Sequence, residues 1–157
     1  RVVLLGVHNS ILLVGIEKKN KVLALDVETG EIKLEIDTFV KGLLIDKEKG
    51  LLHQLLVNYA AFDLQTGALK VNFRDNAYFK SVGIESQRFN FALSGDYIFK
   101  TDWQKGNIGA FNLITHKFDW IHREEDIFFP SPKPIEYHDP YLFLHDNNDT
   151  LHIFEKE

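Results

Sequence analysis

The chain has 157 residues, of which 45% are hydrophobic and 26% are charged, so its length and composition fit one folded domain with a sizeable core. Its 18 Lys and Arg residues against 23 Asp and Glu residues give a net charge of −5, and no basic stripe is present, which disfavours nucleic acid as a partner. It has no cysteine, which excludes disulfides and thiolate zinc sites. No apolar stretch approaches the roughly 20 residues of a membrane helix, so we expect a soluble protein without a membrane partner.

The first elements predicted along the chain are β-strands. Apolar runs that are too short for helices lie at 2–6, 11–16 and 21–27. Asp26 then opens the turn sequence Asp-Val-Glu-Thr-Gly, in which the Asp side chain can bond backbone groups and Gly30 can adopt a positive φ. The segment 31–37 alternates apolar and charged residues, as expected of an outer strand with one face in water.

The same succession recurs at intervals of about 40 residues, which is typical of a repeated supersecondary unit. The repeated phrases are VLALDVETGEIKLEI at 22–36, YAAFDLQTGALKVNF at 59–73, IGAFNLITHKFDWIH at 108–122 and a shortened LHIFEKE at 151–157, anchored on Asp26, Asp63, Asn112 and Glu155. Further apolar runs precede the later phrases, although the stretch between Phe79 and Leu93 is poorly defined. We therefore predict an all-β chain of four antiparallel meanders, at approximately 1–37, 38–75, 76–123 and 124–157, the last without its outer strand.

These phrases resemble the blade repeat of quinoprotein-type (PQQ-like) β-propellers. The first two match well, the third has His116 in place of glycine, and Trp120 stands where the family often has its outer-strand Trp. The resemblance implies a β-propeller-like array of four blades in a single domain, a small or partial propeller. It implies little about a ligand, because propellers host many functions. Members that use the quinone cofactor are larger and carry a calcium site and an acidic base, and no cofactor-docking element of this chain matches them.

How the ring closes is left open by the sequence. The chain begins at Arg1 without Met, so we expect a leader, a tag or a larger N-terminal part to precede it. The segment 2–6 either pairs with 151–155 and clasps the ring, or forms the innermost strand of the first blade while residues outside this chain close the ring. We expect a cytoplasmic protein, with a periplasmic or secreted location as the alternative.

Candidate catalytic and metal sites are weak in this sequence. Five of the seven histidines follow residue 115, but none is closely paired with a second His, so we predict no metal site. The segment Asp146–Thr150 has oxygen ligands of the kind that calcium prefers, but it lacks an EF-hand spacing and is predicted to be a hairpin turn. Ser94 has no neighbouring base, so we predict neither an enzyme nor a cofactor.

Aromatic and acidic residues in predicted loops form the candidate binding surface. They are expected on the face opposite the Thr-Gly hairpins, and they are Tyr78, Asp102, Trp103, Glu124, Glu125, Asp126, Phe129 and Asp149. Such a surface suits a basic protein partner, because aromatic side chains bury large areas and an acidic rim accelerates encounter. The alternative is structural: Phe128 and Phe129 fill the centre of the ring and Tyr78 covers a blade edge.

Two classes of function compete on this basis. The first is a non-enzymatic protein-binding module, such as a small inhibitor or a bacterial immunity protein that masks a basic toxin or nuclease. The second is a fragment of a larger propeller that binds a small ligand or cofactor as part of an enzyme. Acidity, small size and the lack of a catalytic set favour the first class.

Overall fold

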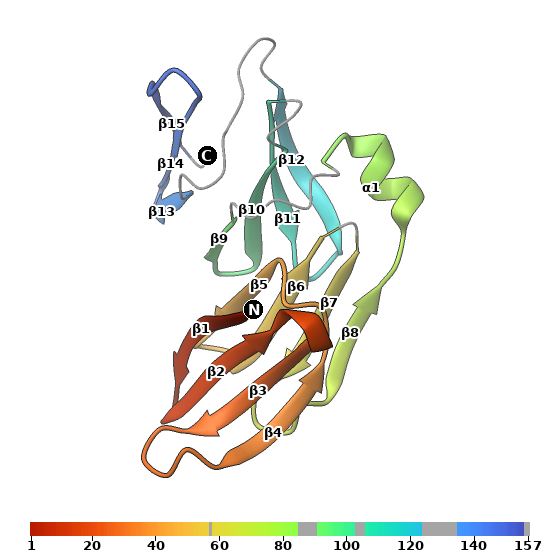
Figure 1. Ribbon diagram of the computed structural model, residues 1–157. Coiled ribbons are helices and arrows are strands. Elements are labelled where there is room, and N and C mark those ends of the chain that lie inside the picture. Colours follow the sequence, from red (N-terminus) through yellow and green to blue (C-terminus); the bar gives the residue numbers. More distant parts are fainter. Residues whose placement is uncertain (57, 85–90, 103–105, 124–134, 156–157) are drawn as a thin grey trace. The chain divides into compact units, whose positions relative to one another are not determined.

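The computed structural model describes residues 1–56, 58–84, 91–102, 106–123 and 135–155 (Figure 1). These residues form four antiparallel sheets and one short α-helix, which confirms the prediction of an all-β, propeller-like array of four meanders. The chain divides into two compact units, Arg1–Phe73 and Arg74–Glu157, with two sheets in each. The described part of the chain holds no helix long and apolar enough to cross a membrane.

The first unit contains two four-stranded sheets in sequential order. The strands are β1 (Val2–His8), β2 (Ile11–Ile16), β3 (Lys21–Asp26) and β4 (Ile32–Asp37), then β5 (Leu43–Asp46), β6 (Leu51–Leu55), β7 (Tyr59–Asp63) and β8 (Leu69–Phe73). Strand β1 pairs with β2, so the segment 2–6 belongs to the first sheet, as the second of the two alternatives required. A 3-10 turn at Glu17–Lys19 joins β2 to β3. Buried side chains of both sheets, including Leu13 and Leu52, form one core cluster.

The second unit contains a helix, a four-stranded sheet and a three-stranded sheet. Its elements are α1 (Asn76–Val82), β9 (Phe91–Ser94), β10 (Tyr97–Asp102), β11 (Asn107–Asn112), β12 (Lys117–Arg123), β13 (Glu136–His138), β14 (Tyr141–His145) and β15 (Leu151–Glu155). The described residues of the last sheet run in the order β13-β14-β15, without the outer strand that the other sheets have. Buried Phe99 and Ile108 of the third sheet pack in one cluster with Leu142 and Leu144 of the fourth.

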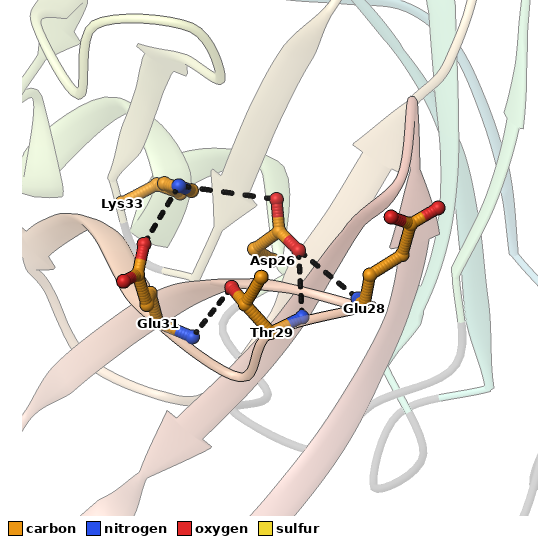
Figure 2. Close-up of polar contacts among 5 residues, drawn as sticks. All are labelled: Asp26, Glu28, Thr29, Glu31 and Lys33. Atoms are coloured by element: carbon orange, nitrogen blue, oxygen red, sulfur yellow. Dashed lines mark hydrogen bonds and ion pairs between the residues drawn. The ribbon is translucent and has the colours of Figure 1, made fainter.

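The hairpin between the third and fourth strands of a sheet has the same construction in three sheets. Figure 2 shows the first of them, where Asp26 Oδ1 accepts hydrogen bonds from the backbone N–H groups of Glu28 and Thr29. Gly30 and Gly67 both have φ of +72°, as their place in the turn predicted, and His116 takes this conformation in the third sheet with φ of +57°. A local side-chain bond and a left-handed residue therefore fix each turn.

Helix α1 lies in the segment that was predicted to be a loop. Asp75 caps its N-terminus by accepting a bond from the Tyr78 N–H, and Gly83 ends it with φ of +74°. Phe79 is fully buried against Phe111 and Phe118, with ring centroids 5.8 and 6.0 Å away. Phe79 thus serves packing, and Tyr78 contacts Phe118 of the outer strand, as the structural alternative for Tyr78 expected.

Candidate functional site

An open pocket of about 630 Å³ lies between the third and fourth sheets, within the second unit. Residues that pair directly across neighbouring strands point to the same face of a sheet. Ala110 pairs with both Phe99 and Trp120, so these three lie on one face of the third sheet. On the fourth sheet, Leu142 pairs with both Tyr137 and Phe154, which puts these three on one face. The pocket lining combines these two faces with Tyr97, Asp119, His122, Pro140, Ile153 and Glu155.

Aromatic rings form most of the apolar wall of the pocket. Phe154 approaches His122 at 4.9 Å and Trp120 at 5.7 Å between ring centroids, and the rings of Trp120 and His122 are stacked at 5.9 Å. Phe99 of the third sheet and Tyr137 of the fourth also stack, with ring centroids 5.1 Å apart. Trp120 remains 37% exposed, so part of a large indole surface is available to a ligand.

Asp119 supplies a fixed carboxylate to this pocket. Its Oδ2 accepts hydrogen bonds from the Tyr97 hydroxyl at 3.0 Å and from the Asn112 side-chain amide at 2.7 Å. The bond to Asp119 raises the pKa of Tyr97, because the carboxylate stabilises the protonated phenol. Tyr97 therefore stays a donor at neutral pH, and two donors orient the carboxylate.

A β-bulge in β12 explains why Asp119 occupies this place. Ala110 pairs with Trp120 and the next residue, Phe111, pairs with Phe118, so Asp119 is the extra residue of the outer strand. The first two sheets have the same bulge at the same point, and the extra residues there are Lys33 and Lys70. Asp119 is therefore the acidic member of an otherwise basic repeat position.

The predicted binding residues that the structure describes lie outside the pocket. Trp103, Glu124, Glu125, Asp126 and Phe129 fall outside the described residues, so their predicted role stays a prediction. Tyr78 lies in α1 and packs on Phe118, and its hydroxyl accepts a bond from the Phe118 N–H at 2.5 Å. Asp102 ends β10 with only 2% of its surface exposed, and Asp149 lies exposed in the β14–β15 turn with φ of +63°.

The structure brings none of Tyr78, Asp102 and Asp149 into the pocket lining. Asp119 is bonded to Asn112, the anchor of the hairpin, so this part of the pocket is at the hairpin end of the sheet and not on the predicted opposite face. Sequence reasoning missed Tyr97, Asp119 and Glu155. An alignment of the three bulge positions, Lys, Lys and Asp, carries the signal for Asp119.

The segment Asp146–Thr150 forms the turn that the sequence predicted. Asp146 Oδ1 accepts bonds from the N–H groups of Asn148 and Thr150, and Oδ2 lies 2.9 Å from His152 Nε2. These bonds lower the pKa of Asp146, with His152 as the main cause. Among the described residues, no group of three or more His, Cys, Asp or Glu side chains is arranged to hold a metal ion.

A second polar cluster lies in the first unit but is closed to ligands. His53 Nδ1 lies 3.0 Å from the Tyr59 hydroxyl and its Nε2 lies 3.5 Å from Asp46 Oδ2. Burial lowers the pKa of His53 and raises the pKa of Tyr59 to about 12. All three side chains are buried, with 1% of His53 exposed, so this cluster holds the second sheet together and has no access to a substrate.

Lys100 in β10 is the other buried ionisable group of note. It is fully buried beside Asp102, and its ammonium group lies 5.9 Å from the centre of the Phe91 ring. Burial lowers the pKa of Lys100 to about 8, and the charge of Asp102 opposes this effect. Lys100 is not part of the pocket lining, so we assign it to the interior of the third sheet.

No protein-family model matches this chain, and no curated protein sequence matches it. Its fold is similar to those of the computationally designed Ika4 protein, BamB from Moraxella catarrhalis and the β-propeller domain of Cps50 (Swd1) from Myceliophteria thermophila. The TM-scores are 0.72, 0.62 and 0.72, at sequence identities of 14%, 18% and 14%. These similarities cover 99%, 96% and 100% of this chain, which has a propeller repeat fold. The chain spans 91% of the length of Ika4. It spans about half of the other two, namely 45% of BamB and 53% of the Swd1 domain.

Proposed function

We propose that this chain is a non-enzymatic protein-interaction module that binds a partner through the pocket between its third and fourth sheets. The observation that carries the proposal is the combination of exposed aromatic surface at Trp120 with the oriented carboxylate of Asp119. Exposed aromatic rings supply binding energy at protein interfaces, and a fixed charge supplies specificity. The propeller repeat fold is compatible with this role, because one fold hosts many functions and the site decides which.

The finer form of the proposal is an inhibitor or immunity protein that masks a basic toxin or nuclease. The net charge of −5 and the small size of the chain support it. The predicted loop surface with Trp103, Glu124 and Glu125, expected on the face opposite the hairpins, would contact the same partner as a second surface. We also propose that the repeat is of the quinoprotein type, because the first two repeats retain the Asp-x-x-Thr-Gly turn.

The second candidate is a piece of a larger propeller that binds a small ligand or cofactor. The observation in its favour is that the chain spans about half of BamB and of the Swd1 domain. A pocket of about 630 Å³ is also in the size range of small-molecule sites. A partner that binds the isolated chain through Trp120 favours the first candidate over this one.

The test is affinity capture from the native host, followed by direct binding measurements with the purified partner. We expect Trp120→Ala to weaken partner binding by about 2 kcal/mol, because truncating a central aromatic anchor has such effects. The matched control is Ile114→Ala, since Ile114 is 71% exposed in a hairpin turn and does not line the pocket. Equal binding by both folded variants, checked by circular dichroism, would refute the role of the pocket.

A further inference from the structure

We propose that the pocket recognises a positively charged side chain of a peptide segment, with a guanidinium group as its best match. This inference rests on the proposed function and specifies the chemistry of the same site. The group would lie against the Asp119 carboxylate with its flat face on the aromatic wall that Trp120 and Phe154 form.

The charge balance of the repeated bulge favours a cationic ligand at the third sheet. In the first sheet Lys33 Nζ lies 3.9 Å from Asp26 Oδ2, and in the second Lys70 Nζ lies 3.5 Å from Asp63 Oδ2. Each hairpin anchor thus has the lysine of its own bulge as a countercharge, and Lys33 also pairs with Glu31 at 3.1 Å. In the third sheet the anchor is the uncharged Asn112 and the bulge residue is Asp119, so the pair carries a net negative charge.

The Asp119 carboxylate can accept a further hydrogen bond. Both of its hydrogen bonds, from Tyr97 and Asn112, go to Oδ2, which leaves Oδ1 without a donor among the described residues. Both of these partners are uncharged at neutral pH, so neither of them compensates the negative charge of Asp119. Glu155 adds a second, exposed carboxylate to the lining, and in the described part of the chain neither carboxylate forms an ion pair.

The aromatic wall suits the same ligand. The faces of Trp, Tyr and Phe rings attract cations, and a cation–π contact contributes about 0.5–2 kcal/mol depending on its exposure. The pocket presents such rings from Tyr97, Trp120, Tyr137 and Phe154. Carboxylates and aromatic faces in one pocket therefore favour a cation with a flat apolar surface.

Other ligand classes fit the pocket less well. An anion would meet two carboxylates in the lining and be repelled. A purely apolar ligand would cover Asp119 without neutralising it, and burying an unpaired charge is costly. A cationic side chain satisfies both the charge and the rings.

The test uses an acetylated Gly-Arg-Gly-Arg-Gly peptide and the same peptide with citrulline, which has the shape of arginine without its charge. The chain has two tryptophans, so their indole N–H signals in a nitrogen–proton correlation spectrum report on the site, with Trp120→Phe assigning the signal of Trp120. We expect the arginine peptide to shift the Trp120 signal to saturation, with at least tenfold higher affinity than the citrulline peptide.

The charge requirement is tested with Asp119→Asn, which can still accept the bonds from Tyr97 and Asn112. We expect this variant to lose at least tenfold in affinity for the arginine peptide and to discriminate little against citrulline. The matched control is Glu136→Gln, because Glu136 is exposed and alternates with Tyr137, so it faces away from the pocket. Its affinity for the arginine peptide should stay within twofold of the parent.

Three outcomes overturn the inference: neither peptide binds, both bind equally, or Asp119→Asn binds the arginine peptide unchanged. Each leaves the proposed function to be decided by Trp120→Ala and the captured partner. Conversely, the chain could bind the arginine peptide selectively while Trp120→Ala leaves the affinity for the captured partner unchanged. That result would support the pocket chemistry and refute the proposed function. The two failures are therefore distinguishable.

Discussion

Asp26 and Asp63 show how single side chains fix the repeat. Each accepts two backbone hydrogen bonds through one carboxylate oxygen, from residues two and three positions further along the turn. These bonds, with the one from Thr29 or Thr66 as the largest cause, lower the pKa of both carboxyl groups. The aspartates therefore act as ionised turn anchors, and the structural role assigned to them from the sequence follows from these contacts.

The glycines of the same turns allow a matched prediction. Gly30 and Gly67 have the same φ of +72°, but a Cβ at Gly30 would meet no atom within 4 Å, whereas one at Gly67 would collide with Leu34 Cδ1. We expect Gly30→Ala to reduce the free energy of unfolding by about 1 kcal/mol, the cost of a left-handed non-glycine residue. Gly67→Ala should cost roughly 1 kcal/mol more, because Leu34 packs against the core of the first unit.

Urea unfolding of the two variants and the parent checks this pair. Equal losses would mean that Leu34 relaxes without cost. A loss below about 0.3 kcal/mol for Gly30→Ala would contradict the conformational argument itself.

At the scale of elements, the outer strand β12 combines a structural role with the proposed role in recognition. Its bulge places Asp119 at the pocket, while Phe118 lies among Tyr78, Phe79 and Phe111. Helix α1 thus packs beside an outer strand that would otherwise expose its backbone edge. Figure 1 shows α1 next to β12 within the second unit.

Tyr78→Phe separates the structural role of Tyr78 from its predicted role in binding. The substitution removes the hydroxyl that accepts the Phe118 N–H, so we expect a loss of about 1 kcal/mol in the free energy of unfolding. The arginine-peptide affinity should remain within twofold, because Tyr78 does not line the pocket. Chemical denaturation and the peptide titration measure the two effects. If Tyr78→Phe left the stability unchanged and weakened peptide binding, the predicted role of Tyr78 in the binding interface would be supported instead.

The strands and hairpins could be predicted because their causes are local. Two-residue alternation defines the outer strands, and Asp with Gly defines the turns. Helix α1 is only seven residues long, too short to show a helical period, although Asp75 and Gly83 are typical cap residues. The pocket could not be predicted in the same way, because Tyr97, Trp120 and Phe154 meet only when two sheets pack.

At the scale of the whole molecule, the net charge of −5 acts before any contact forms. Fields from surface carboxylates extend over a Debye length, about 10 Å at 0.1 M salt, and would attract the basic partner proposed above. Contacts inside the pocket act after encounter. Association and dissociation should therefore respond to different residues of this protein.

The double charge reversal Glu124→Lys and Glu125→Lys tests this division against the captured partner. If the predicted acidic rim steers encounter, this variant should associate about tenfold more slowly and show a weaker salt dependence, with its dissociation rate little changed. The control is Glu28→Lys with Glu48→Lys, which alters the net charge equally at two exposed turn residues of the first unit. Binding kinetics at low and high ionic strength measure both variants. If both double variants slowed association equally, the steering would come from net charge alone. Glu124 and Glu125 would then no longer belong to the proposed interface.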